Sequence, residues 1–287
     1  MGKDWAKGLT KATDPRVARN AAVRKGLKYR HHLSPEQDRR RQSRGTPLDT
    51  TWTPRLGYAV GLIATDGSVS NTGQQVTVVS GDRQVLEAFK SCIPRAGRIG
   101  PHGPNAYDVS VSSVIFCRWL ATIGIHPSKS LTIGGLVVPD EFFFDVARGL
   151  LDGDGSVNNF VANPGGAAKR YPNYRYERLN AVFRSASTSH LEWIRSTMRR
   201  LLGVETTILR EPIQRPTSRM YTLRYGKHAS LKIFDRLYHD PNAPCLERKR
   251  RVWSSYLARP PLNSMQKRRS GGMAVSAASR AVGPKGP

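Results

Sequence analysis

The stretch 59–69 reads AVGLIATDGSV, and the stretch 147–157 reads ARGLLDGDGSV. Each opens with an apolar run of helical length, has a glycine at the same place, and closes with Asp-Gly-Ser-Val. The closing aspartates, Asp66 and Asp154, are 88 positions apart (154 − 66). A repeat of this kind predicts two equivalent halves within one chain, because the same local structure is specified twice.

The sequence that follows each aspartate also repeats, in the order strand, strand, helix, strand, strand, helix. In the first half the periodic segments are 68–71, 75–80, 85–93, 98–101, 107–111 and 114–123. In the second half they are 156–161, 179–185, 191–201, 206–210, 219–225 and 228–238. Ser189 and Glu192 form a capping-box pattern for the middle helix of the second half, and Gly203 marks its end. We therefore expect an α+β fold of two tandem pseudo-symmetric αββαββα halves.

Composition divides the 287 residues into five expected segments. Residues 1–50 form a basic arm with thirteen Lys+Arg against five Asp+Glu, followed by a first half at 54–126. A linker at 127–139 leads to a second half at 140–258, and a Gly-, Ala- and Pro-rich basic tail at 259–287 is expected to be disordered. The second half contains seventeen extra residues at 162–178, which predict an extended basic and aromatic loop.

The charge balance indicates an anionic partner. The chain has 46 Lys+Arg and 21 Asp+Glu, a net charge of +25, and nucleic acid is the leading candidate for a protein of this charge. Since no run of eighteen apolar residues and no signal-peptide core is present, we expect a cytoplasmic protein without a membrane partner. The three cysteines lack Cys-x-x-Cys spacing, which argues against a zinc site.

The two motif helices are expected to pack against each other at the centre of the molecule. Gly61 and Gly149 each cost about 1 kcal/mol relative to alanine in a helix, and close helix-to-helix approach would compensate for that loss. Asp66 and Asp154 lie at helix C-termini, where a carboxylate is unfavourable by about 0.3–1 kcal/mol. Side-by-side helices would bring the two carboxylates together, and a divalent cation between them would relieve their repulsion. Asp152 points to another side of the helix end and is expected to be a cap or a solvated group.

These paired motifs resemble those of single-chain LAGLIDADG homing endonucleases, over residues 54–257. The linker 124–130, GIHPSKS, and the late stretch 246–249, LERK, followed by Trp253, are also similar to family members. The resemblance implies packed motif helices and antiparallel sheets that form a DNA-binding saddle. It also implies a monomer that cuts both strands of a double-stranded DNA site, leaving 3′ overhangs, with Mg²⁺ or Mn²⁺ held by Asp66 and Asp154. The arm stretch 5–17 resembles nuclease-associated modular motifs, which implies an auxiliary DNA contact.

The resemblance also implies a lysine in the catalytic pocket. Lys227 occupies the place where family members often carry it, whereas the corresponding first-half positions are Ser112 and Ser113. Lys129, in the linker, is a second candidate. A pocket of this asymmetric kind predicts unequal cutting of the two strands.

Polar residues that alternate with apolar ones along the strands are the expected DNA contacts, because a wet sheet face offers the donors and acceptors that a major groove requires. The candidates are Gln75, Thr77 and Ser110 in the first half, Asn180, Arg184, Thr222 and Arg224 in the second, and Lys169, Arg170 and Arg175 in the inserted loop.

A binding function remains the alternative to an enzyme. The same fold could serve an RNA maturase that assists splicing of a host intron RNA, or a transcription regulator. A protein that has lost cleavage would be expected to lose one or both motif aspartates. The presence of both Asp66 and Asp154 therefore favours the endonuclease.

Overall fold

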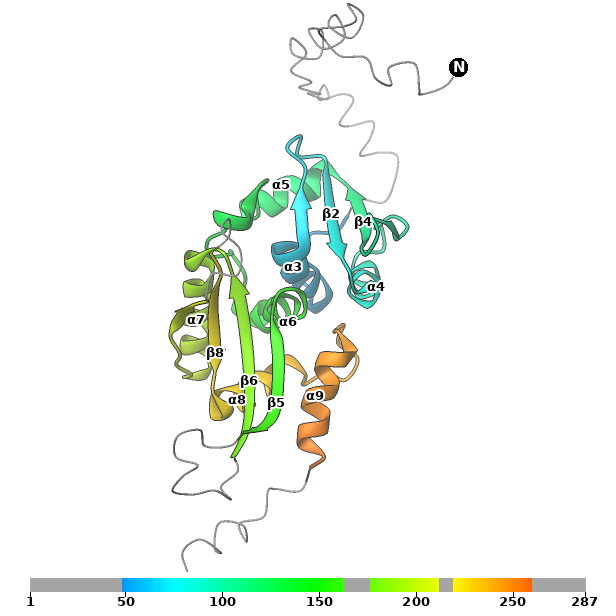
Figure 1. Ribbon diagram of the computed structural model, residues 1–287. Helices are drawn as coiled ribbons and strands as arrows, with labels where there is room; N and C mark the ends of the chain where they lie inside the picture. Colours follow the sequence, from blue (N-terminus) through cyan, green and yellow to red (C-terminus); the bar gives the residue numbers. More distant parts are fainter. Residues whose placement is uncertain (1–47, 163–175, 212–218, 260–287) are drawn as a thin grey trace, which may run out of the picture.

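The computed structural model describes residues 48–162, 176–211 and 219–259 (Figure 1). The first half consists of α3 (Pro54–Asp66), β1 (Gly67–Val69), β2 (Gln75–Ser80), α4 (Arg83–Cys92), β3 (Gly100–Pro101), β4 (Tyr107–Ser112) and α5 (Val114–Thr122). The second half consists of α6 (Phe143–Gly153), β5 (Ser156–Ala162), β6 (Tyr176–Ser185), α7 (Thr188–Leu202), β7 (Ile208–Arg210), β8 (Tyr221–Tyr225) and α8 (Lys227–Leu237). The predicted αββαββα order is confirmed in both halves.

The two sheets have the same topology. Each is four-stranded, with the orders β1-β2-β4-β3 and β5-β6-β8-β7, and all the strand pairs are antiparallel. Between the halves run two short 3₁₀ helices, η1 (Lys129–Leu131) and η2 (Asp140–Phe142). The fold is therefore α+β with two pseudo-symmetric halves, as predicted.

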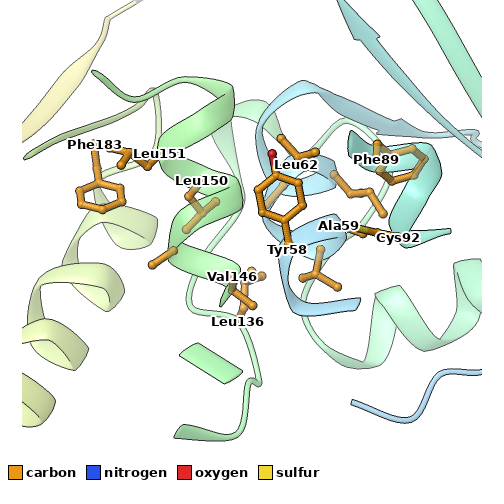
Figure 2. Close-up of a cluster of buried hydrophobic side chains, with 14 of the residues drawn as sticks. Tyr58, Ala59, Leu62, Phe89, Cys92, Leu136, Val146, Leu150, Leu151 and Phe183 are labelled. Atoms are coloured by element: carbon orange, nitrogen blue, oxygen red, sulfur yellow. The ribbon is translucent and has the colours of Figure 1, made fainter. Parts of the chain in front are cut away.

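The motif helices α3 and α6 pack against each other between the two sheets (Figures 1 and 2). A Cβ atom placed on Gly61 would lie 2.2 Å from the Val146 carbonyl oxygen, and one on Gly149 would lie 2.2 Å from the Tyr58 carbonyl oxygen. Both distances are too short for any side chain, so the two backbones touch at these glycines. The predicted close approach of the motif helices is confirmed.

Apolar side chains anchor each motif helix to its own half (Figure 2). Leu62 of α3 and Phe89 of α4 are fully buried on the first-half side, and Leu151 of α6 and Phe183 of β6 are buried on the second-half side. The core is thus continuous across the α3–α6 contact. Any change in the distance between these helices must disturb both halves.

Two local expectations differ from the structure. The helix α7 is capped by Ser187, whose hydroxyl accepts from the His190 N–H, so the predicted start at Ser189 is wrong by two residues. Gly203 does end α7, with φ at 63°. An additional helix that the sequence did not predict, α9 (Glu247–Leu257), follows α8 and lies beside β5. Within the described residues, no helix has the length and apolar character needed to cross a membrane.

Candidate active site

Asp66 and Asp154 meet where α3 and α6 end. Asp66 is the last residue of α3, and Asp154 directly follows α6 as its C-cap. A Cβ atom on Gly153 would lie 3.1 Å from Asp66 Oδ2 and 2.0 Å from Thr65 Oγ1. Glycine at position 153 therefore lets the end of the first motif approach the residue just before Asp154.

The surroundings of these carboxyl groups oppose their ionisation. Burial, together with the negative charge of Asp154, raises the pKa of Asp66 from 3.8 to about 7. Burial also raises the pKa of Asp154, although this side chain keeps an exposed face toward solvent. Two carboxylates forced together in this way favour a bound cation, because a positive charge removes both the burial penalty and the repulsion.

Two buried lysines flank the carboxyl groups in equivalent positions. Lys129 Nζ donates to the carbonyl oxygen of Gly67, the residue after Asp66. Lys249 Nζ donates at 2.8 Å to the carbonyl oxygen of Gly155, the residue after Asp154. Both side chains are about 95% buried, with exposures of 5% and 4%. The pseudo-symmetry of the halves therefore extends to the cations of the site.

Burial lowers the pKa of both lysines from 10.5 to about 8. The charges of Asp154 and Asp66 act in the opposite direction on both, and Asp152 also supports the charge of Lys249. In turn, the two lysines lower the pKa of both motif carboxyls, and Arg184 acts on Asp154 as well. These groups form one electrostatic cluster, in which the pKa values of the two lysines lie well below the usual lysine value.

Lys227 does not belong to this cluster, and its predicted place in the pocket is wrong. Its Nζ lies 3.4 Å from Glu177 Oε2 and 5.5 Å from the centre of the Tyr256 ring. Glu177, Leu179 and Ala181 are spaced two residues apart along β6, so Glu177 shares the face of the buried Leu179 and Ala181, which the helices cover. Lys227 therefore points to the helical side of the sheet.

Asp152 is not solvated. It is 1% exposed, and its Oδ2 accepts from the Tyr58 hydroxyl at 3.0 Å and from the Leu246 N–H at 2.6 Å. Asp152 thus binds the start of another helix and not the end of its own, because Leu246 is the N-cap residue of α9.

Arg148 is a second polar residue of α6 that holds the C-terminal segment. It is fully buried and donates at 2.9 Å to the carbonyl oxygens of both Leu237 and Pro244. Its third partner is Asp145 Oδ1, at 2.6 Å. The chain between α8 and α9 is thus fastened to α6 by side chains.

The candidate DNA contacts of the first half lie on the uncovered side of its sheet. Gln75, Thr77 and Ser110 are half-buried and alternate with the buried Val76 and Val78 of β2 and Val109 of β4. The hydroxyls of Thr77 and Ser110 are hydrogen-bonded to each other at 2.9 Å. Together with Gln75, they form a neutral polar surface beside β1.

The second sheet presents cations on the corresponding side. Arg224 is exposed, Arg184 is half-buried with its Nε 2.7 Å from Glu211 Oε1, and Asn180 donates its amide to the Tyr225 carbonyl oxygen at 2.8 Å. Thr222 is only 2% exposed, and its hydroxyl donates to Glu211, so its predicted exposure is wrong. Lys169, Arg170 and Arg175 lie outside the described residues.

Lys249 is the site residue that sequence reasoning missed. The stretch 246–249, which contains it, resembles family members but does not by itself indicate a role for this lysine. Its position after the last helix of the second half parallels that of Lys129 after α5, and this parallel was the available signal.

Comparison with known proteins gives matches among solved structures alone. No family model and no curated protein matches the chain. Mesophilic variants of the homing endonuclease I-DmoI are 12% identical over 70% of this chain and 97% of theirs, with a TM-score of 0.46. The meganuclease I-SmaMI bound to uncleaveable DNA is 11% identical over 74% of this chain and 89% of its own, with a TM-score of 0.48. Full-length DUF199/WhiA from Thermatoga maritima is 11% identical over 78% of this chain and 67% of its own, with a TM-score of 0.44. At these identities the likeness is one of fold.

Proposed function

We propose that this protein is a monomeric, site-specific endonuclease that hydrolyses phosphodiester bonds in both strands of a DNA target. The observation that carries the proposal is the meeting of Asp66 and Asp154 at the α3–α6 contact, with Lys129 and Lys249 at matching carbonyl oxygens on either side. Each half supplies one carboxyl group, and the segment that follows its last helix supplies one ammonium group. Such a pseudo-symmetric centre suits a substrate with two similar scissile bonds, as duplex DNA has.

The donor set fits Mg²⁺ or Mn²⁺. Mg²⁺ is commonly held by one or two carboxylates together with substrate phosphates, and Asp66 and Asp154 would be those carboxylates. Within the described residues, no group of three or more His, Cys, Asp or Glu could hold an ion. When bound with DNA, a divalent ion at such a site can activate water and stabilise the oxygens of the reacting phosphate.

The chain's own residues have distinct tasks in the proposed reaction. Asp66 and Asp154 hold negative charge where a cation and the scissile phosphates would gather. Lys129 and Lys249, with pKa values of about 8, supply positive charge near the phosphate oxygens as negative charge develops there. Arg184, whose charge acts on Asp154, would contact phosphate near the same centre.

The uncovered faces of the two sheets are the proposed surfaces for reading the DNA sequence. Gln75, Thr77 and Ser110 on one sheet and Asn180 and Arg224 on the other offer donors and acceptors at strand spacing. The net charge of +25 supplies attraction to the backbone. The basic arm 1–50 and the loop residues Lys169, Arg170 and Arg175 would add further DNA contacts.

The test is cleavage of a plasmid library with randomised target sites by the purified protein in Mg²⁺. We expect linear product at one sequence, lost by more than about 1,000-fold in Asp66→Asn and Asp154→Asn while DNA binding persists. Lys227→Met is the matched control, and it should keep cleavage within about threefold. Salt-sensitive binding with no cut under any condition would contradict the proposal and support an RNA maturase or a transcription regulator instead, and retention assays with intron RNA or duplex DNA would separate these two.

A further inference from the structure

The two lysines of the site are held in different ways. Lys249 Nζ donates to three carbonyl oxygens, those of Leu151 at 2.5 Å, Asp152 at 2.9 Å and Gly155 at 2.8 Å. Lys129 Nζ donates to the Gly67 carbonyl oxygen as its hydrogen-bond partner among the described residues. The two lysines therefore occupy equivalent positions but are held by different contacts.

Asp152 is the buried group that fixes the segment carrying Lys249. Its Oδ2 holds the N–H of Leu246, the N-cap residue of α9, and Lys249 lies three residues later in the first turn of that helix. A carboxyl group at a helix N-terminus also interacts favourably with the helix dipole. The same oxygen accepts from the Tyr58 hydroxyl of α3. One atom thus ties the start of α9 to both motif helices.

The first half has no counterpart of this device. With the offset of 88 residues between the motifs (154 − 66), Asp152 corresponds to Ala64 (152 − 88). Ala64 is an apolar residue of the core with an exposure of 9%. A change at Asp152 therefore removes the contact that fixes the helix carrying Lys249, whereas the segment carrying Lys129 has no equivalent contact to lose.

We propose that Asp152 is a positioning residue that fixes the position of the Lys249 ammonium group and thereby controls the cutting of one strand of the DNA target. The inference rests on the proposed function. Its mechanism is geometric: the carboxyl group fixes the first turn of α9, and the ammonium group of Lys249 is delivered beside Asp154. Loss of the contact lets α9 shift, and a displacement of about 1 Å at a catalytic group can cost about 100-fold in rate.

The test measures both strands separately. A duplex target labelled with a different fluorophore on each strand is cut under single-turnover conditions. Lys249→Met and Lys129→Met first identify which strand depends on which lysine. We expect Asp152→Ala to slow the Lys249-dependent strand by about 10- to 100-fold and the other strand by less than threefold, so that nicked product accumulates.

Two further variants separate positioning from loss of structure. Asp152→Asn keeps an oxygen that can accept from Leu246 and Tyr58, so it should restore the strand ratio to within about threefold of the wild type. Glu247→Ala, in the same turn of α9 but paired with Arg250 at 2.6 Å, should leave both strands unchanged. Partial unfolding cannot imitate the expected result, because it removes active protein and slows both strands equally. If the alanine variant does not fold, Asp152→Thr, whose side chain lacks the carboxyl group that accepts from Leu246, takes its place.

The outcomes distinguish the inference from the proposed function. Equal slowing of both strands in Asp152→Ala, or no slowing, would overturn the inference and leave the endonuclease intact. A wild-type protein that cuts neither strand would overturn both. Hydrogen exchange adds a readout without DNA: the first-turn amides of α9 should exchange faster in Asp152→Ala than in Asp152→Asn, and equal rates would count against the positioning role.

Discussion

Replacement of Gly61 by alanine should separate the two motif helices and destabilise the protein by about 2 kcal/mol. The added methyl group would lie 2.2 Å from the Val146 carbonyl oxygen and 2.8 Å from Gly149 Cα, whereas ordinary contact begins near 3.4 Å. Because both neighbours are backbone atoms, no change of rotamer can relieve the clash. The helices must move apart by about 1 Å. Overpacking of this kind costs about 1–3 kcal/mol or more, and the better helix propensity of alanine returns about 1 kcal/mol.

Gly57 provides the matched control in the same helix. A methyl group there would lie 3.0 Å from Asp145 Cβ, which belongs to a side chain, and 3.4 Å from the Phe142 carbonyl oxygen. A shift of a few tenths of an ångström accommodates it, so Gly57→Ala should change the free energy of unfolding by less than about 1 kcal/mol. Urea titrations of both variants would measure the difference, with the denaturant slope expected to stay constant.

The same substitution should impair cleavage more than it impairs folding. Asp66 ends one of the two helices that Gly61→Ala forces apart and Asp154 directly follows the other, so their separation changes with the helix spacing. A displacement of about 1 Å is expected to reduce the cleavage rate by about 100-fold in fully folded protein. Equal stability of the Gly61 and Gly57 variants would refute the backbone-contact argument. Unchanged cleavage by Gly61→Ala would refute the link between helix spacing and the site.

Three further outcomes follow from the charges of the site. Because burial raises the pKa of Asp66 from 3.8 to about 7, ionisation of Asp66 opposes folding. In EDTA, the free energy of unfolding of the wild type should therefore fall between pH 4 and pH 7 by on the order of 3 kcal/mol more than that of Asp66→Asn. Parallel plots of stability against pH for the two proteins would contradict this expectation. Lys249→Met should slow the cutting of one DNA strand by about 100-fold or more in quench-flow assays, while the dissociation constant for DNA changes less than threefold. Arg184→Ala should lower the salt slope of DNA binding, measured by fluorescence anisotropy, by about one, and an unchanged slope would place Arg184 away from phosphate.

The sequence predicted the architecture because the decisive signals are local and occur twice. A mid-helix glycine and a closing Asp-Gly each have an ordinary explanation when seen once. At matching positions in two copies, Gly61 with Gly149 and Asp66 with Asp154 specify a contact between the copies. That contact fixes the centre of the fold, and it brings together the two aspartates of the candidate site, so both features could be predicted from the sequence.

The errors lie where a residue's role depends on a partner far along the chain. Strand alternation placed Thr222 on a wet face, but Glu211 covers it. The position of Lys227 at a strand end does not reveal that Glu177 draws it to the helical side of the sheet. Lys249 lies 95 residues after Asp154 (249 − 154) and reaches Gly155 only through the path of the chain between α8 and α9. Periodicity contains no information on such a path.

The course of the chain between α8 and α9 explains why the second motif departs from an apolar pattern. Positions 148 and 152 hold buried charged groups, whereas the equivalent first-half positions hold Val60 and Ala64, both in the core. Burying an ion costs several kcal/mol unless hydrogen bonds compensate for it, so stability alone favours the first-half solution. Arg148 and Asp152 direct those hydrogen bonds to backbone groups of the segment from Leu237 to Leu246. The buried charges specify one course for this segment, and that course ends with Lys249 beside Asp154.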